Sequence, residues 1–268
     1  MEDLSSLNSI SMNVAAPIVA SFGLRSLAIP VQTFTTQSEA DGQVPPIIAL
    51  DWLQKTLLQA HQQFAGQTNY GLIGYLGTAE IVQTITQSKL IDDFNLLVVD
   101  PVMADQGKFY PLLDQQYLVS LKQLLTMADV VTPNLTELAL LTGHQYRANI
   151  SEVELGNQVA ELRKQLKADA QVIVTGIEQE QQIGCYWDTS VSRGTYYLEK
   201  VPGHFYGTGD AFAAILLGKL AQQIPLVDAI PAIMQLMQQV VQDTLLAEND
   251  LKLGIDVTRI LQRNWKSE

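Results

Sequence analysis

The sequence has few cysteines, few basic residues and no long apolar run. Its one cysteine, Cys185, cannot form an internal disulfide, which is typical of a protein in a reducing cytoplasm. Lys and Arg number 16 against 28 Asp and Glu, a net charge of −12, which argues against a broad basic surface for nucleic acid or anionic lipid. No stretch approaches the roughly 18 apolar residues that a membrane helix needs. We therefore expect a cytoplasmic protein with no nucleic-acid or membrane partner, in which Cys185 is a buried structural residue.

The N-terminus and the composition fit a folded protein with a sizeable core. The opening MEDLSSLNSISMN has neither a basic region nor an apolar segment, so it does not resemble a signal peptide. Hydrophobic residues make up 47% of the 268 residues, and this length fits one large α/β domain or two small ones. The acidic charge does not exclude an anionic small molecule, because backbone amides and a metal ion suffice to bind one.

Short apolar runs alternate with segments of helical periodicity along the chain. The runs that predict strands are NYGLIGYLG (69–77), NLLVVDP (95–101), DVVTPN (129–134) and AQVIVTG (170–176). Residues 181–201 alternate in hydrophobicity and predict a hairpin around Arg193-Gly194. Strands that alternate with helices indicate a mostly parallel sheet covered on both faces. Ligands of such sheets bind beyond the carboxyl ends of the strands, where the informative motifs of this chain fall.

Several predicted helices have recognisable ends. Thr78 is a candidate N-cap for the helix that follows the glycine turn at residue 77. The helix in NLTELALLTG (134–143) is expected to end at Gly143. Two further helices are expected to begin at about residues 208 and 225.

One of these helices begins with an unusual turn, Gly207-Thr208-Gly209-Asp210. A glycine turn that leads into a helix exposes unpaired N–H groups at the positive end of the helix dipole, which suits a phosphate. Capping the helix is one role open to Asp210. A carboxylate beside a phosphate would repel it, however, and such an unfavourable placement is explained if the carboxylate takes part in the reaction. As a general base, Asp210 would accept the proton of a hydroxyl group that attacks a phosphoryl group.

Two other polar motifs lie at predicted strand ends. Asp100 ends a buried strand and Asp105 lies in the following loop, and acidic groups in such places hold Mg²⁺ directly or through water. Asn134 and Glu137 are three residues apart at the start of a helix and are candidates for outer-shell support of the metal and phosphates. The alternatives are a turn aspartate before proline for Asp100 and an ordinary helix start for Asn134 and Glu137.

Three motifs, in this order and at these separations, resemble the pyridoxal kinase family of the ribokinase-like superfamily. They are VVDPVMADQG, ADVVTPNLTELALLTG and VPGHFYGTGDAFAA, and the opening EDLSSLNSISMNVAAPIVASFG and the stretch IGYLG also fit. The resemblance covers nearly the whole chain. It implies a single three-layer αβα domain over residues 1–268 that transfers the γ-phosphoryl group of ATP to the 5′-hydroxymethyl group of pyridoxal, pyridoxine or pyridoxamine. It also implies a homodimer, and leaves open whether a monovalent cation takes part.

The resemblance assigns a role to each matching position. Asp210 corresponds to the catalytic base, and Gly207, Thr208 and Gly209 correspond to the anion hole. The metal and phosphate positions are matched by Asn134, Glu137, Asp100, Asp105 and Thr175. On the substrate side, Tyr75 corresponds to an aromatic residue that packs on the pyridine ring. Asp3 lies where family members carry a small polar residue or Asp that binds the ring substituents.

The chain departs from the family pattern at its start and at the substrate side. Related chains carry several apolar residues before MEDLSS that form the first strand. We therefore expect a central strand to be missing, and the natural chain to extend upstream of Met1 with a mass above 29.5 kDa. Gln37 and Ser38 stand where many relatives carry a substrate-contacting His and Thr. Both can hydrogen-bond, but Gln cannot become cationic, which leaves the choice among B6 vitamers open.

Two other functions remain open on the sequence. A hydroxymethylpyrimidine or phosphomethylpyrimidine kinase of thiamine synthesis shares the fold and the GTGD turn, although those enzymes usually begin with a glycine-rich stretch that LSSLNSISMN does not resemble. A catalytically silent paralogue that binds a B6 compound or a nucleotide is the other. The presence of Asp210, Asn134 and Glu137 argues against it, because a binding protein gains nothing from a general base.

Overall fold

A six-stranded sheet forms the middle layer of the computed structural model, which describes residues 1–36, 45–247 and 250–265. The strands, in spatial order, are β10 (Arg193–Glu199), β9 (Gln182–Asp188), β8 (Gln171–Gln179), β7 (Val130–Val131), β4 (Leu96–Val99) and β3 (Tyr70–Ile73). The run from β3 to β8 is parallel, whereas β9 and β10 are antiparallel. A separate small hairpin consists of β5 (Ala104–Asp105) and β6 (Lys108–Phe109).

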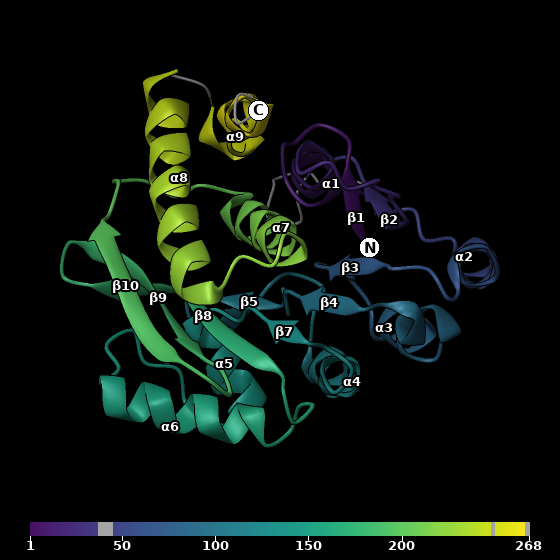
Figure 1. The fold of residues 1–268 in the computed structure, drawn as a ribbon, viewed down its shortest axis with the longest axis horizontal. Coiled ribbons are helices and arrows are strands. Elements are labelled where there is room, and N and C mark those ends of the chain that lie inside the picture. The colour runs from purple at the N-terminus through teal and green to yellow at the C-terminus, as the bar shows by residue number, and fades with distance from the viewer. Residues whose placement is uncertain (37–44, 248–249, 266–268) are drawn as a thin grey trace.

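Helices cover both faces of the sheet (Figure 1), which confirms the predicted three-layer αβα architecture. The helices of one face are α1 (Met12–Ser21), α7 (Thr208–Ala221), α8 (Leu226–Leu246) and α9 (Thr258–Trp265). Those of the other face are α3 (Ala79–Thr86), α4 (Gln115–Leu125), α5 (Leu135–Thr142) and α6 (Glu152–Arg163), with α2 (Leu50–Phe64) beside α3. Two short 3₁₀ helices are η1 (Lys89–Asp93) and η2 (Leu251–Leu253). No described helix is long and apolar enough to cross a membrane.

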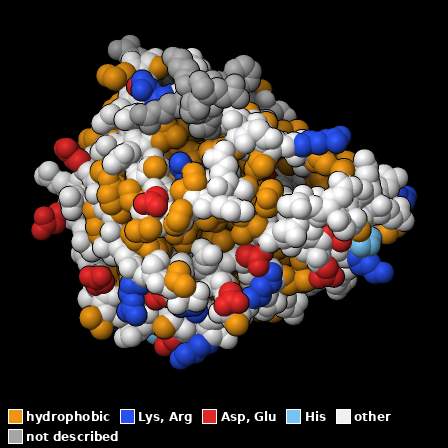
Figure 2. All heavy atoms as spheres, in the orientation of Figure 1, with side chains coloured by type: hydrophobic (Ala, Val, Ile, Leu, Met, Phe, Trp, Pro, Cys, Tyr) orange, Lys and Arg blue, Asp and Glu red, His pale blue; other side chains and the backbone are white. Residues whose placement is uncertain are grey.

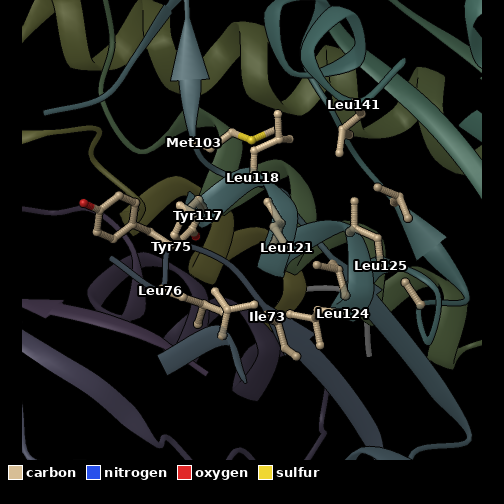
Figure 3. Packing of buried hydrophobic residues seen from close by; sticks show 14 of the residues in the cluster. Ile73, Tyr75, Leu76, Met103, Tyr117, Leu118, Leu121, Leu124, Leu125 and Leu141 are labelled. Carbon is tan, nitrogen blue, oxygen red and sulfur yellow. The ribbon is translucent and has the colours of Figure 1, made fainter. Parts of the chain in front are cut away.

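Two hydrophobic clusters, one on each face of the sheet, form the core. Strand β4 shows the alternation that produces them, because Leu97 and Val99 belong to one cluster and Val98 to the other. Figure 3 shows the first cluster, in which Leu121 and Leu124 of α4 pack near Ile73 of β3. A strand buried on both faces needs apolar side chains at every position, which is why these strands read as continuous apolar runs.

The strand that the sequence analysis expected to be missing is present. Residues Glu2–Ser5 form β1, which pairs in parallel with β2 (Pro30–Phe34). The amide of Gly74 donates to the Met1 carbonyl and that of Asp3 to the Tyr75 carbonyl, so β1 lies beside the end of β3. The expectation that the first strand is missing was therefore wrong, although strand pairing places β1 in a two-stranded sheet with β2, apart from the six-stranded sheet. The expectation rested on the apolar residues that relatives carry before MEDLSS. Here Glu2–Ser5 form the strand instead, and the carboxylic residues Glu2 and Asp3 are only 3% exposed in it.

The hairpin of β9 and β10 is confirmed, but its turn lies at residues 189–192, before Arg193-Gly194. Thr189 Oγ1 accepts from the amides of Val191 and Ser192 and so closes this turn. Gly194 lies inside β10, where a Cβ would collide with the ring of Trp187 on β9. The glycine that suggested a turn is instead required by a close cross-strand contact.

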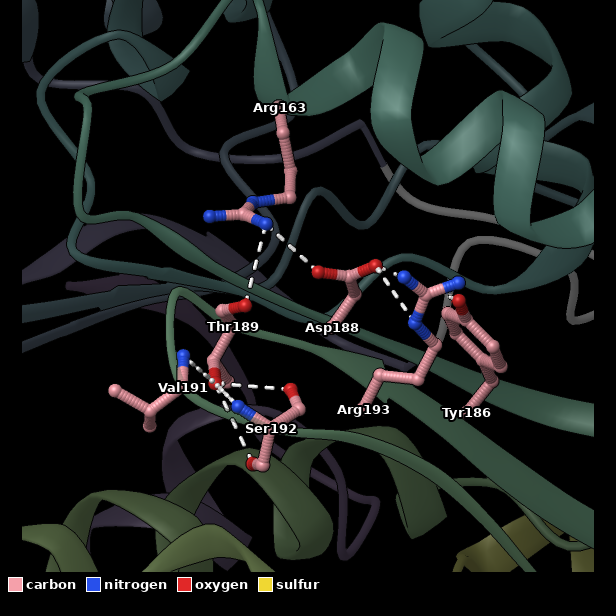
Figure 4. A network of polar contacts seen from close by, with 7 residues as sticks. All are labelled: Arg163, Tyr186, Asp188, Thr189, Val191, Ser192 and Arg193. Carbon is pink, nitrogen blue, oxygen red and sulfur yellow. Dashed lines mark hydrogen bonds and ion pairs between the residues drawn. The ribbon is translucent and has the colours of Figure 1, made fainter.

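A polar network ties this hairpin to α6 (Figure 4). Arg163 Nη1 donates to Asp188 Oδ1 at 2.7 Å and to the Thr189 carbonyl at 3.3 Å. Arg193 lies on the other side of Asp188, with 3.9 Å between its Nε and Asp188 Oδ2. Asp188 is buried, and these partners compensate its charge there.

Both predicted helix ends are confirmed. Thr78 Oγ1 accepts from the Ile81 amide at the start of α3. Gly143 follows α5 with φ 76°, a conformation that favours glycine at the end of a helix. On the face of the molecule in Figure 2, hydrophobic side chains gather in the middle and charged side chains lie mostly toward the rim.

Candidate active site

A cavity of about 820 Å³ opens beside the carboxyl ends of the parallel strands. All candidate residues from the sequence that the structure describes line it: Asp3, Tyr75, Asp100, Asp105, Asn134, Glu137, Thr175, Gly207, Thr208, Gly209 and Asp210. Gln37 and Ser38 lie outside the described residues. The topology thus gathers groups that are up to 207 residues apart in the sequence, from Asp3 to Asp210, as expected for this edge of a parallel sheet.

The glycine turn before α7 has a conformation that a larger residue would not tolerate. Gly207 has φ 87° and ψ 0°, and a Cβ there would lie 2.7 Å from the Ser9 carbonyl oxygen. The helix begins at Thr208, and its first internal hydrogen bond runs from the Ala211 amide to the Gly207 carbonyl. The amides of Thr208, Gly209 and Asp210 therefore have no acceptor within the helix. They form a positive N-terminus in the cavity wall that suits an anionic oxygen.

Asp210 is held by a backbone amide from a distant part of the chain. Its Oδ2 accepts from the Ser11 N–H at 2.6 Å. Burial raises the pKa of Asp210, and the bond from Ser11 partly opposes that rise by favouring the charged carboxylate. Ser11 itself has φ 47°, a strained conformation for a residue with a side chain. Ser11 could not be found from the sequence, because its contribution is a main-chain N–H that no residue type signals.

Asp100 lies at the end of β4, close to the start of α7. It is 7% exposed, and a Cβ on Gly209 would lie 3.4 Å from its Oδ2. Burial, followed by the charges of Glu137 and Asp210, raises the pKa of Asp100 well above its ordinary value. A cation beside this carboxylate would oppose that rise, because it favours the charged form.

Asn134 and Glu137 form a capping box at the start of α5. Glu137 Oε2 accepts from the Asn134 amide, and Asn134 Oδ1 accepts from the Glu137 amide. The same two side chains hold the loop before β5, since Glu137 Oε1 accepts from Met103 N and Asn134 Nδ2 donates to the Ala104 carbonyl. Burial raises the pKa of Glu137 to about 8. The pair thus both starts the helix and positions β5, so that Asp105, which was expected in a loop, lies in a short strand.

This donor set fits a magnesium ion that is held mostly through water. Mg²⁺ prefers oxygen ligands and keeps several of its waters. Asp100 is the carboxylate available near the glycine turn, whereas both oxygens of Glu137 are already hydrogen-bonded. In the described part of the chain, no group of three or more His, Cys, Asp and Glu side chains could hold a metal alone. The oxygens of a bound phosphate would have to supply the remaining ligands.

The two ends of the cavity differ in chemistry. Asp3, Phe34 and Tyr75 line one end, where the Phe34 and Tyr75 rings have centroids 6.1 Å apart at 55°. Asp3 Oδ1 is buried and has no hydrogen-bond partner among the described residues. Burial raises the pKa of Asp3 to about 7, although a hydrogen bond with Ser11 opposes the rise. Phe34 was missed in the sequence, where one aromatic residue in a strand reads as core.

The other end of the cavity lies between the β9–β10 hairpin and α8. Apolar side chains line most of it: Ile183, Leu198, Phe212, Met234, Met237 and Val241. Cys185 is also here, and burial raises the pKa of its thiol to about 12, so it stays protonated and inert. Its predicted structural role agrees with this environment. Helix α7 contributes to both ends, because Asp210 lies near enough to Asp3 to raise its pKa and Phe212 lines the apolar end.

Comparison with known proteins decides the family. The model of a family described as phosphomethylpyrimidine kinase matches residues 33–253, well over half of the chain. The chain belongs to this family. The ribokinase-like fold and the resemblance to pyridoxal kinases are also confirmed, by the structure of pyridoxal kinase from Lactobacillus plantarum. That structure has a TM-score of 0.90 and 31% identity, and the match covers 98% of this chain and 94% of that one.

The relatives of this chain include proteins described as pyridoxal kinases and proteins described as phosphomethylpyrimidine kinases. A hydroxymethylpyrimidine/phosphomethylpyrimidine kinase from Haemophilus influenzae is 33% identical over 166 residues, and the match spans 59% of each chain. A protein from Bacteroides thetaiotaomicron, described as a phosphomethylpyrimidine kinase and solved with pyridoxal, has a TM-score of 0.90 and 26% identity. That match covers 98% of this chain and 93% of the other. Family membership alone therefore does not choose between a B6 vitamer and a pyrimidine as acceptor.

Proposed function

We propose that the protein transfers the γ-phosphoryl group of ATP to the 5′-hydroxymethyl group of pyridoxal, pyridoxine or pyridoxamine. The observation that carries this proposal is the cavity with two unlike ends that meet at Asp210 and the glycine turn. The end with Asp3, Phe34 and Tyr75 suits a small polar aromatic ring, and the end beside α8 suits a nucleotide base. A transferred phosphoryl group would then lie between them, at the start of α7.

Asp210 is the proposed general base. In its ionised form it accepts the hydroxyl proton while the hydroxyl oxygen forms a bond to the γ-phosphorus and the bond from that phosphorus to the ADP oxygen breaks. The Ser11 amide holds the Asp210 carboxylate in place throughout. The amides of Thr208 and Gly209 donate to the phosphoryl oxygens, where negative charge is spread during transfer. Asp100 would hold Mg²⁺, directly or through water, and the metal would neutralise charge on the phosphates.

The choice of a B6 vitamer over a pyrimidine rests on the cavity end that Asp3, Phe34 and Tyr75 line. The related protein from B. thetaiotaomicron was solved with pyridoxal, although it is described as a phosphomethylpyrimidine kinase. Asp3 provides a buried acceptor that no described residue uses, and a ring or ring substituent that bears N–H or O–H donors would satisfy it. Hydroxymethylpyrimidine phosphorylation is the second candidate, which the family description and the H. influenzae relative favour. The homodimer, the cytoplasmic location and a monovalent cation stay predictions.

An assay of ADP release tests this proposal. We expect ADP to form when ATP, Mg²⁺ and any one of the three B6 vitamers are present, and to stop when EDTA removes the metal. A phosphorylated vitamer must appear in equal amount. No ADP release with any vitamer, from folded protein that binds ATP, would refute the B6 kinase and favour the pyrimidine acceptor or a silent paralogue.

Asp3→Asn is expected to stabilise the folded protein above about pH 7 and to weaken vitamer binding. Burial raises the pKa of Asp3 from 3.8 to about 7, so between these values the folded protein holds a proton that the unfolded chain has lost. The free energy of unfolding of the wild type therefore falls as the pH rises through this range, by up to about 1.4 kcal/mol for each pKa unit. The variant has no such proton to lose, and it keeps the shape of the side chain.

Urea unfolding near the two ends of this pH range measures the effect. The variant should gain stability over the wild type at about pH 8 relative to about pH 5. In the kinase assay its KM for the vitamer should rise while its KM for ATP stays the same. If the difference in free energy of unfolding between Asp3→Asn and the wild type did not change with pH, Asp3 would already be ionised in the folded protein at low pH.

A further inference from the structure

Among the described residues that line the cavity end beside α8, Gln238 of α8 is the one with a side-chain amide. Gln238 lines the cavity with Leu198 and Met237, and it is half-buried. Its Nε2 donates to the backbone carbonyl of Glu199, at the end of β10, over 2.8 Å. This bond joins α8 to the edge strand of the sheet at the mouth of the apolar end.

The hydrogen bond to Glu199 fixes which way the amide faces. A backbone carbonyl can only accept, so the NH₂ group of Gln238 must point toward it. The other atom of the amide, Oε1, is an acceptor with no hydrogen of its own, and no described residue donates to it. Rotation of the amide would place two acceptors face to face. The cavity wall therefore presents a hydrogen-bond acceptor of fixed identity beside an apolar surface that suits a purine ring.

We propose that Gln238 selects adenine over guanine nucleotides by accepting a hydrogen bond from the 6-amino group of the base. Adenine carries an amino donor at this position, whereas guanine carries a carbonyl acceptor. Guanine would set its O6 against Gln238 Oε1 and leave both acceptors unpaired, which a site built for hydrogen bonding rejects. This inference rests on the proposed function only in that the nucleotide occupies the end beside α8.

Gln235 provides a matched control. It is the same residue type on the same helix, and its Nε2 also donates to the hairpin, to Tyr196 Oη at 2.9 Å. Gln235 does not line the cavity. A substitution at Gln235 therefore removes one bond between α8 and β10 without changing the wall that faces the base. Substitution by Met keeps the length of either side chain and removes its polar atoms.

The experiment is a calorimetric comparison of three nucleoside diphosphates with the wild type, Gln238→Met and Gln235→Met. The probes are ADP, GDP and the diphosphate of purine riboside, which has hydrogen in place of the amino group. The wild type should bind ADP about tenfold more tightly than the purine compound, and GDP more weakly still. Gln238→Met should bind ADP and the purine compound alike, with little change for the purine compound. Gln235→Met should behave as the wild type.

Three results would overturn the inference: equal binding of the three probes by the wild type, discrimination that survives in Gln238→Met, or equal loss of it in Gln235→Met. The wild-type series needs no variant, so the test stands even if Gln238→Met is unstable. No acceptor substrate is present in this measurement. A protein that prefers ADP through Gln238 but phosphorylates no B6 vitamer would therefore refute the proposed function and leave this inference intact.

Discussion

Asp210→Ala is expected to lower kcat by about 100-fold or more while nucleotide binding stays nearly unchanged. The variant removes the group that would take the hydroxyl proton, but it keeps the backbone amides at the start of α7 that would bind the phosphates. Steady-state kinetics with a vitamer and calorimetry with ADP measure the two effects separately. A variant of near wild-type rate would show that Asp210 is not the general base.

Asp228→Ala is the matched control for this experiment. Asp228 is the third residue of α8, as Asp210 is of α7, and it is exposed. Both variants lose a carboxylate that interacts favourably with a helix N-terminus, an effect of about 0.3–1 kcal/mol. Only Asp210 lines the cavity. We therefore expect Asp228→Ala to lose at most a little stability and no activity.

The pH dependence of the rate is a second test of Asp210 as the general base. Burial raises the pKa of Asp210, so the base is protonated, and inactive, at higher pH than an ordinary Asp would be. As the pH is lowered, the rate should therefore begin to fall at a higher pH than an ordinary Asp base would give. The residual activity of Asp210→Ala should lack that fall.

Gly207→Ala is expected to destabilise the protein by about 2–5 kcal/mol and to abolish most activity. Its φ of 87° is unfavourable for alanine, and the new Cβ would lie 2.7 Å from the Ser9 carbonyl oxygen. Relief of this contact requires the glycine turn to move away from Ser9, in the segment before α1, which also moves the amides of Thr208 and Gly209. Urea unfolding and kcat measure the two losses.

Gly143→Ala separates backbone strain from collision. Gly143 has φ 76°, close to that of Gly207, but a Cβ there would meet nothing within 4 Å. This control should lose only the cost of the left-handed conformation, about 1–2 kcal/mol, and keep its activity. If Gly207→Ala were no worse than Gly143→Ala in stability, the close approach of the turn to Ser9 would not matter.

The sequence predicted those parts of the molecule that local patterns determine. The buried strands read as apolar runs because both faces of the sheet are covered, and Thr78 and Gly143 mark helix ends through their own side-chain and backbone chemistry. The candidate residues could be predicted to lie in one site because parallel strands bring their carboxyl ends to one edge of the sheet.

Features that depend on distant contacts could not be predicted. Strand β1 carries Glu2 and Asp3, whose burial is set by neighbours on β2 and β3. The Ser11 amide meets Asp210 across 199 residues and leaves no trace in residue type. Gly194 suggested a turn from local preference, but the ring of Trp187 on the neighbouring strand is what requires it. Glu137 was a candidate for metal and phosphate support or for a helix start, and neither role predicts that its second oxygen accepts from the Met103 amide.

The most direct test of the proposed function is an internal competition between acceptors. Pyridoxal and hydroxymethylpyrimidine are supplied together in equal amounts with limiting ATP and Mg²⁺, and the two phosphorylated products are quantified by mass spectrometry. The product ratio gives the ratio of kcat/KM values without separate assays. The proposed function predicts mostly pyridoxal 5′-phosphate, with neither product from Asp210→Ala. A mixture dominated by the phosphorylated pyrimidine would contradict it and place the same catalytic residues in a pyrimidine kinase.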